Sequence, residues 1–306
     1  MGTVMTWKSP PDLTGRTYAV TGGNAGIGYF ISEQLTVAGA KVVILARNAD
    51  RARAAADAIR SQTGKAVAAT LPLDLADLDS VATAAAELSK QDRLDGLIHN
   101  AGITAGKQRR TTRQGFELVV GTNHLGHFAL AAQTMPILAA TPGSRVVLVS
   151  SLTTKLAKFD PEDLQSEQSY TQQKAYAQSK HAVLLFAFEL DRRLRASGVD
   201  VRAIAAHPGL GLNMFSPARP GINRAPRVRL PLPLQGKDRG ARPAVRAATD
   251  PDALGGQYYG PKYGIFGRPV VASPPQISGN RELAARLWTQ SEQLTGVTFE
   301  LPAGER

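Results

Sequence analysis

Two tyrosines in this chain stand four residues before a lysine, a spacing that can support acid/base chemistry. Tyr170 precedes Lys174, and Tyr176 precedes Lys180. On a helix, residues i and i+4 share a face, so the phenol and the ammonium of such a pair point into the same space. The cation favours phenolate over phenol and is expected to lower the phenol's pKa toward the range useful for a general acid or base.

Only the second pair lies inside a run that predicts a buried helix, Tyr176–Ser197. The sequence therefore favours Tyr176 as the reactive phenol. Lys180 is predicted to be its cationic neighbour.

A glycine-rich turn follows the first predicted strand. The stretch Thr21-Gly22-Gly23-Asn24-Ala25-Gly26-Ile27-Gly28 opens a helix, where backbone amides and the helix N-terminus can receive a pyrophosphate. A tight strand-to-helix turn without a ligand is the alternative reading. The predicted contacts here are Gly22, Asn24, Gly26, Ile27 and Gly28.

The end of the second predicted strand indicates which dinucleotide binds. NAD-binding folds place an acid there to hold the ribose 2′-hydroxyl, whereas this chain has Ala46-Arg47-Asn48. A guanidinium binds a 2′-phosphate bidentately, so Arg47, beside Asn48, predicts NADP(H). The alternative is a solvated arginine at the start of the next helix.

Three more strand ends carry candidate site residues. Asp74 and Leu75 are predicted to meet the adenine edge, and Asn100-Ala101-Gly102 to approach a cofactor ribose closely. Ser151 follows the fifth strand, where its hydroxyl can polarise a substrate carbonyl.

The elements that must position these residues alternate between two kinds. Short β-branched apolar runs alternate with alanine-rich stretches of helical period from Thr17 to about His207, which predicts a parallel sheet covered on both faces. The predicted strands are Tyr18–Thr21, Lys41–Ala46, Ala66–Leu71, Gly96–His99, Arg145–Ser150 and Val201–Ala206. The predicted helices are Ala49–Gln62, Asp79–Lys90, Gly115–Ala140, Tyr176–Ser197 and Asn280–Gln293. The fold class is therefore α/β, a Rossmann-type doubly wound sheet that binds ligands at the carboxyl ends of its strands.

The chain is predicted to be one domain over residues 1–306, with a core at about 15–210. Residues 216–244 are rich in Pro, Arg and Gly without sustained period, which predicts an irregular substrate lid or lobe at about 211–245. A helix and tail at about 279–306 are predicted to complete the domain.

These motifs, in this order, resemble the short-chain dehydrogenase/reductase family over about residues 15–210. The matching features are Thr-Gly-x-x-x-Gly-x-Gly, Asn-Ala-Gly, Asn123, Ser151, Tyr-x-x-x-Lys and Pro208-Gly209. The phrases Ala46-Arg47-Asn48, Asn123 to Phe128, and Arg286 to Val297 look like its retinol-dehydrogenase and WW-domain-oxidoreductase branch.

The resemblance implies a role for each matched residue. Tyr176 is expected to be the proton donor, Ser151 the carbonyl orienter, Lys180 the ribose anchor, and Asn123 the holder of a relay water. Pro208 and Gly209 join the cofactor site. The family's Tyr-x-x-x-Lys is commonly followed by small and apolar residues, as Lys180 is here, so Tyr170 and Lys174 are expected to be the helix entry.

Two departures from the family pattern stand out. Leu210-Gly211-Leu212-Asn213 follows Pro-Gly where members often carry a threonine that binds the nicotinamide carboxamide, and Asn213 is a possible substitute. The spacing from Ser151 to Tyr176 is longer than in many members, which leaves Ser150 as an alternative.

Composition narrows the function further. There is no cysteine, so disulfides, thiol nucleophiles and cysteine-ligated metals are excluded, and the five histidines show no metal-ligand spacing. The net charge of +11 is scattered and comes with no nucleic-acid motif. We expect a cytoplasmic protein with no membrane span, no metal and no nucleic-acid partner, which forms a homodimer or homotetramer by analogy with the family.

The sequence thus predicts an NADP(H)-dependent alcohol dehydrogenase or carbonyl reductase for a small apolar substrate, with Leu152, Leu210, Met214 and Phe215 as candidate pocket residues. A catalytically silent NADP-sensing protein of the same fold is the alternative, although the Ser/Tyr/Lys set is complete. Protochlorophyllide reductases share the layout but normally use a cysteine, which this chain lacks.

Overall fold

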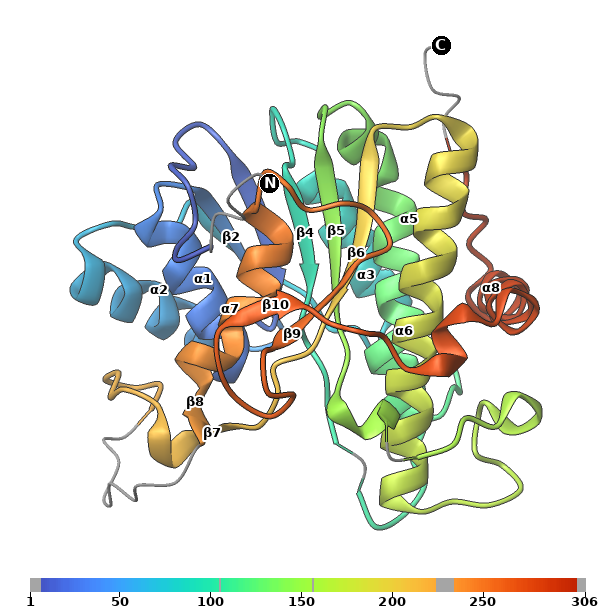
Figure 1. Ribbon diagram of the computed structural model, residues 1–306. Coiled ribbons are helices and arrows are strands. Elements are labelled where there is room, and N and C mark those ends of the chain that lie inside the picture. Colours follow the sequence, from blue (N-terminus) through green and yellow to red (C-terminus); the bar gives the residue numbers. More distant parts are fainter. Residues whose placement is uncertain (1–6, 105, 156, 224–233, 302–306) are drawn as a thin grey trace, which may run out of the picture.

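An eight-stranded sheet forms the centre of the computed structural model (Figure 1), which describes residues 7–104, 106–155, 157–223 and 234–301. Its strand order is β10-β9-β6-β5-β4-β1-β2-β3. All neighbours are parallel except β9 and β10. The strands are β1 (Thr17–Thr21), β2 (Lys41–Ala46), β3 (Ala69–Pro72), β4 (Gly96–His99), β5 (Ser144–Val149), β6 (Val201–Ala206), β9 (Tyr258–Pro261) and β10 (Pro269–Val271). A separate short ladder pairs β7 (Gly211–Leu212) with β8 (Gln235–Gly236).

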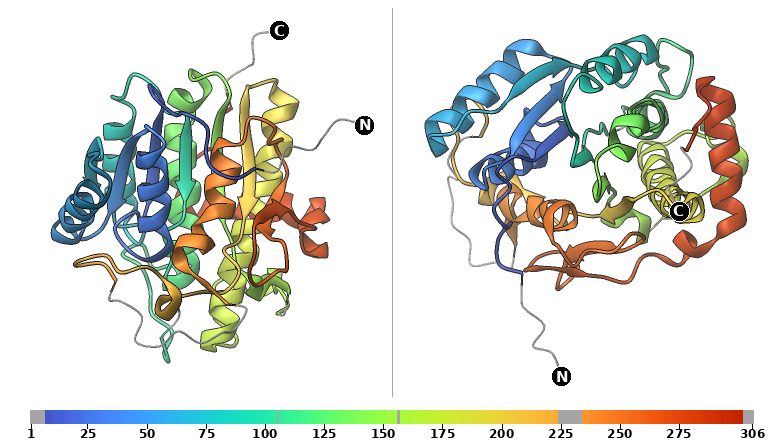
Figure 2. Two further views of the ribbon diagram at one scale, coloured as in Figure 1. Left: turned by 60° about the vertical axis from the view of Figure 1, so that its left-hand side comes forward. Right: turned by 90° about the horizontal axis from the view of Figure 1, so that it is seen from above.

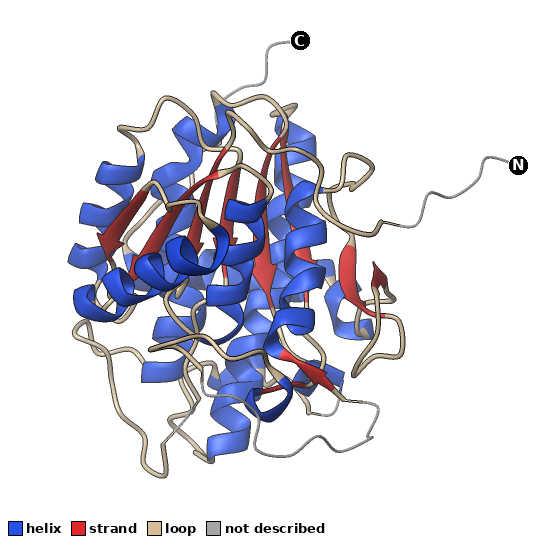
Figure 3. Cartoon of the chain, turned by 90° about the vertical axis from the view of Figure 1, so that its left-hand side faces the viewer, coloured by secondary structure: helices blue, strands red, loops and turns tan. Residues whose placement is uncertain are grey.

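Helices cover both faces of this sheet (Figures 2 and 3). One layer holds α1 (Gly26–Val37), α2 (Ala49–Thr63) and α7 (Lys237–Thr249), and its core includes Phe30, Ile44 and Val245. The opposite layer holds α3 (Leu78–Leu88), α5 (Gly126–Ala139) and α6 (Gln172–Ser197). Helix α8 (Arg281–Thr295) packs outside α6, where Trp288 joins a cluster with Phe128, Phe186 and Phe299. This arrangement confirms the predicted doubly wound fold.

The strand order reverses between β1 and β4. From β1 the chain crosses to β2 and β3 on one side, and then returns to β4 on the other. The loops after β1 and β4 therefore diverge and leave a crevice at the carboxyl ends of the strands, which is where such sheets bind ligands.

The predicted helix over Gly115–Ala140 is interrupted. A single turn, α4 (Leu118–Val120), leads into a π-helical turn, η1 (Gly121–Leu125), before α5 begins. The Glu117 carboxylate, which is fully buried, caps α4 by accepting from the amides of Val119 and Val120 at 3.0 and 2.8 Å. The helix consequently starts at Leu118 rather than Gly115.

The prediction of an irregular segment over 216–244 is wrong for its last part. Helix α7 begins at Lys237, despite Gly240 and Pro243 in its interior, and lies on the sheet beside α1. Its small buried residues, among them Ala241 and Ala244, permit that close packing. Tertiary packing here outweighs a weak helical propensity. The rest of the predicted lobe contributes β7, β8 and the single turn η4 (Asn213–Phe215), while residues 224–233 lie outside the described part.

The other predicted strand and helix boundaries agree more closely with the structure. Strand β3 starts at Ala69 rather than Ala66, since Gly64 ends α2 in a left-handed conformation and residues 65–68 lead out of that turn. Helix α8 begins at Arg281, one residue after the predicted start at Asn280, because Asn280 is its cap. In the part of the chain that the structure describes, no helix has the length and apolar character needed to cross a bilayer.

Candidate active site

The start of helix α6 separates the two tyrosine-lysine pairs. The Thr171 hydroxyl caps the helix by accepting from the Lys174 amide at 3.0 Å. Tyr170 therefore precedes the helix, and its hydroxyl donates to the carbonyl oxygen of Gly106 at 3.3 Å. Lys174 Nζ forms ion pairs with Asp163 at 3.0 Å and Asp160 at 3.4 Å. The first pair is thus tied to the surrounding loops.

The second pair is placed differently. Lys180 is only 5% exposed, and its ammonium lies 6.0 Å from the centre of the Tyr176 ring. Lys180 Nζ donates to the carbonyl oxygen of Val149 at 2.9 Å, at the end of β5. Burial lowers the pKa of Lys180 to about 8, because the charged ammonium is removed from water. An ideal Cβ on Gly102 would lie 3.4 Å from this ammonium, so the loop after β4 meets the pair.

Asn123 lies in the π turn η1 beside the same lysine. Its side-chain oxygen accepts from the Ile103 amide at 2.8 Å, and its Nδ2 donates to the Ile103 carbonyl at 3.1 Å and to Ser179 Oγ at 2.9 Å. The side chain therefore fastens the loop after β4 to α6. π turns of this kind are frequent at functional sites.

The two candidate serines differ in what their hydroxyls contact. Ser150 is buried and donates to the carbonyl oxygen of Lys180 at 3.0 Å, so its hydroxyl holds α6 against β5. Ser151 is partly exposed, and its hydroxyl lies 3.0 Å from the Thr153 hydroxyl. Ser151 is the serine with a hydroxyl near solvent.

The glycine-rich turn closes tightly between β1 and α1. A Cβ on Gly28 would lie 2.2 Å from the Gly22 carbonyl oxygen and 2.4 Å from Asn100 Nδ2, so only glycine fits there. Asn100 Nδ2 donates to the Thr21 carbonyl at 3.0 Å and so holds the turn itself. The α1 cap residue, Ala25, provides no side-chain acceptor, and no acid lies in the first turn. The positive end of α1 is therefore open to an anion.

The residues predicted to contact the adenosine half lie at the same edge. Arg47 is exposed and has no ion-pair partner among the described residues, whereas the Asn48 side chain caps α2 by accepting from the Arg51 amide at 2.8 Å. One Asp74 oxygen accepts from the Ala76 amide at 3.0 Å. Leu75 is buried, and its backbone packs against Gly126 at the start of α5. Asn24, Ile27 and Ala101 lie partly exposed along this edge.

A buried glutamine that the sequence did not single out fixes the segment after β6. Gln235 Nε2 donates to the Pro208 carbonyl at 2.8 Å, and its Oε1 accepts from the Gly267 amide at 3.2 Å. The Leu210 amide donates to Ile265 at 2.8 Å. Because β9 is parallel to β6, the loop over 262–268 emerges beside Pro208 and Gly209. It adds exposed Tyr263 and Ile265 to the already exposed Leu210 and Met214.

A buried histidine links β1 to the π turn. His127 Nδ1 lies 3.0 Å from the Asn123 carbonyl oxygen, and its Nε2 lies 2.8 Å from the Thr21 hydroxyl. A carbonyl only accepts, so Nδ1 carries the proton and Nε2 accepts from Thr21. Burial lowers the pKa of His127 to about 4, which keeps the ring neutral at pH 7.

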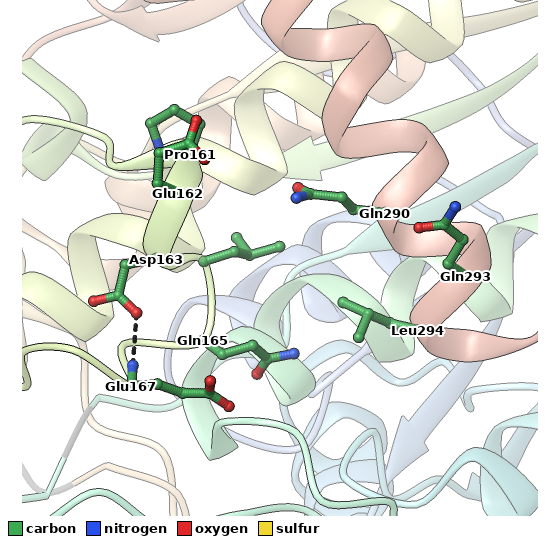
Figure 4. A pocket seen from close by; sticks show the side chains of 9 residues that line it. Pro161, Glu162, Asp163, Gln165, Glu167, Gln290, Gln293 and Leu294 are labelled. Atoms are coloured by element: carbon green, nitrogen blue, oxygen red, sulfur yellow. Dashed lines mark hydrogen bonds between the residues drawn. The ribbon is translucent and has the colours of Figure 1, made fainter.

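Two cavities are lined by residues outside the predicted site. One, of about 330 Å³, is lined by the 161–167 segment and by Gln290, Gln293 and Leu294 of α8 (Figure 4). A second, of about 600 Å³, lies between residues 154–159, His181 and the 273–277 segment. None of the predicted site residues lines either cavity, but the second cavity is lined by Thr154 and His181, which closely follow Ser151 and Lys180 in the chain.

Comparison with known proteins identifies the family of the chain. Over 308 residues the chain is 34% identical to mouse retinol dehydrogenase 14, covering 94% of this chain and 88% of that protein. The structure of an uncharacterised protein from Mycobacterium paratuberculosis is 36% identical, covers 97% of this chain and 100% of its own, and superposes with a TM-score of 0.80. The NADP complex of Pseudomonas aeruginosa RhlG shares the fold at 24% identity and a TM-score of 0.62, over 81% of this chain and 95% of its own. The sequence model described as short chain dehydrogenase matches residues 16–211, and the chain therefore belongs to this oxidoreductase family.

Proposed function

We propose that the protein transfers hydride between NADP(H) and the carbonyl or alcohol carbon of an apolar substrate, with Tyr176 as general acid/base. The observation that carries this proposal is the buried ammonium of Lys180, held by Val149 beside the Tyr176 ring and next to Gly102. Two features support a dinucleotide at this edge. One is the Gly22 to Gly28 turn, in which a side chain at position 28 would clash with the Gly22 carbonyl oxygen, and the other is the open N-terminus of α1.

NADP is proposed over NAD because of the end of β2. Arg47 is exposed there with no ion-pair partner among the described residues, and the two residues that directly follow the strand, Arg47 and Asn48, are not acidic. The fold relative that was solved with NADP agrees with this choice. When bound, the nicotinamide donates or accepts the hydride.

The chain's own groups handle the proton. In reduction, the Tyr176 hydroxyl would donate its proton to the substrate oxygen, and the remaining tyrosinate would be stabilised by the Lys180 ammonium. Ser151 would donate a hydrogen bond to the same oxygen and so stabilise its negative charge. In oxidation the tyrosinate would take the proton back. Asn123 would keep the β4 loop and α6 in register through Ile103 and Ser179.

An apolar substrate is proposed because of the side chains at the rim. Leu210, Met214, Tyr263 and Ile265 are each more than 40% exposed, and the loops that carry them emerge at the same edge as Ser151. Exposed apolar groups gathered at one edge favour an apolar ligand. The similarity to retinol dehydrogenase 14 agrees with a substrate of this kind.

The test compares two phenylalanine variants of one helix. Tyr176→Phe is expected to lower turnover of an aldehyde panel, retinal included, by at least about 10²-fold with NADPH affinity retained. Tyr170→Phe is the matched control and should keep normal turnover. The opposite pattern would overturn the assignment of Tyr176. NADPH binding without turnover of any aldehyde or alcohol would instead favour the NADP-sensing alternative, and tighter binding of NADH would remove the role of Arg47.

A further inference from the structure

A lysine from α7 reaches the N-terminus of α1. An ideal Cβ on Gly26, the first residue of α1, would lie only 3.5 Å from Lys237 Nζ. The Lys237 backbone is held in place, because its amide donates to the Ser216 hydroxyl at 2.8 Å. Next to it, Gln34 of α1 donates to the Asp238 carbonyl at 2.8 Å. These two hydrogen bonds fix the start of α7 and so position the Lys237 ammonium.

This ammonium has no counter-charge. Among the described residues, Lys237 Nζ has neither a hydrogen-bond acceptor nor an ion-pair partner, and the 224–233 segment contains no Asp or Glu. Burial lowers the pKa of Lys237, since part of the side chain is removed from water. Most other half-buried cations here are paired, as Arg219 is with Glu33. No contact within the described part of the protein explains why an unpaired, half-buried lysine stands at this position.

The other side of the same space also lacks an anion. Gly26 has a φ of +56°, and the amides of Ile27 and Gly28 have no acceptor among the described residues. The first turn of α1 has no acidic side chain. A lysine ammonium next to the positive end of a helix is unfavourable unless an anion lies between them. Both features therefore point to one negatively charged ligand.

We propose that Lys237 binds the diphosphate of the dinucleotide from the side opposite the glycine-rich turn. This inference rests on the proposed function, because it assigns a further residue to the same cofactor site. A diphosphate carries the charge that the α1 N-terminus and the ammonium lack, and lysine binds phosphate oxygens as a compact point charge. The segment after β6 thereby contributes a cationic ligand to the cofactor as well as apolar groups to the rim.

The test uses two nucleotide fragments and no turnover. The fragment 2′-phospho-ADP-ribose contains the diphosphate, whereas adenosine 2′-monophosphate does not. Lys237→Gln is expected to raise the Kd of the first about tenfold or more and to leave that of the second unchanged. Lys237→Arg, which keeps the charge, should retain most of the affinity. Lys41→Gln removes an exposed lysine at the opposite edge and controls for net charge.

Salt dependence gives a second readout. Loss of one phosphate contact should make the affinity of 2′-phospho-ADP-ribose for Lys237→Gln fall less steeply with salt than that of the wild type. Equal affinity of wild type and Lys237→Gln for this fragment, with both folded by circular dichroism, would refute the role of Lys237 alone. If the wild type binds neither fragment, the proposed dinucleotide function itself fails.

Discussion

Buried histidines should make this protein sensitive to mild acid, and His99 offers the cleanest test. His99 is 2% exposed, neither ring nitrogen has a hydrogen-bond partner among the described residues, and the ring stacks on His127 at 4.5 Å. Burial lowers the pKa of His99 well below its usual 6.5. The unfolded chain binds a proton below pH 6.5 and the folded chain does not, so stability falls as pH falls through that value.

The size of the pH effect can be judged from the other buried imidazoles. Burial lowers the pKa of His124 to about 3, and the pKa values of His127 and His207 to about 4. For each such group, a change from pH 7 to pH 5 costs about 2 kcal/mol of folding free energy. Three groups together cost about 6 kcal/mol, which is comparable to the whole stability of many domains at about 5–15 kcal/mol. The native state should therefore weaken sharply between pH 6.5 and 5.

The variant His99→Phe removes one of these groups and keeps a ring to stack on His127. Its unfolding free energy in urea, followed by circular dichroism, should match the wild type at pH 7 within about 1 kcal/mol. At pH 5 the variant should be more stable than the wild type by about 2 kcal/mol. Asp163 and Glu189, whose pKa values are lowered, titrate below this window and are common to both proteins. Parallel curves of stability against pH for the two proteins would refute the assignment of a neutral, buried His99.

Three further predictions concern stability. Burial lowers the pKa of Lys180 to about 8, so the buried charge lowers the folding stability by about 3 kcal/mol at pH 7. This destabilisation disappears as pH rises from about 8 to about 10.5. Lys180→Met should therefore be about 2 kcal/mol more stable than the wild type in urea at pH 7, although inactive. Arg219→Met leaves the Glu33 carboxylate buried without its partner and should lose about 3 kcal/mol, part of which the double variant with Glu33→Gln should recover. Trp288→Ala empties the contact of α8 with Phe128 and should lower the unfolding free energy by about 3–5 kcal/mol, whereas a loss below about 1 kcal/mol would show that α8 contributes little.

The elements that the sequence predicted well are those whose signal is local. Strands β1, β2 and β6 are runs of buried, largely apolar residues, and α8 has a capping asparagine before its first turn. Helix α7 escaped prediction because Gly240 and Pro243 argue against a helix, and only its packing on α1 and the sheet compensates. The late start of α4 depends on the burial of Glu117, which the sequence pattern does not reveal.

The residues of the candidate site likewise fall into those with a local sequence signal and those that depend on distant contacts. Tyr176, Lys180 and the glycine-rich turn lie in short motifs whose spacing already implies their geometry. Gln235 and Lys237 were missed because their contacts are made with residues about 30 and about 210 positions earlier in the chain. The link that His127 makes between Thr21 and Asn123 depends on the π turn, which a helical pattern does not show.

The described part of the segment after β6 is attached to the core too firmly to act as a lid over the substrate alone. Arg219 pairs with Glu33 of α1, Lys237 lies against Gly26, and Gln235 joins Pro208 to the loop that carries Tyr263 and Ile265. Any ligand that draws Lys237 toward α1 therefore acts on the same unit that carries the apolar rim. If Lys237 binds the diphosphate, the dinucleotide and the substrate wall are energetically coupled, and by linkage each must strengthen binding of the other by the same factor. Binding of either ligand would then favour binding of the other, which gives the chain a physical reason to combine a phosphate ligand and a substrate wall in one segment.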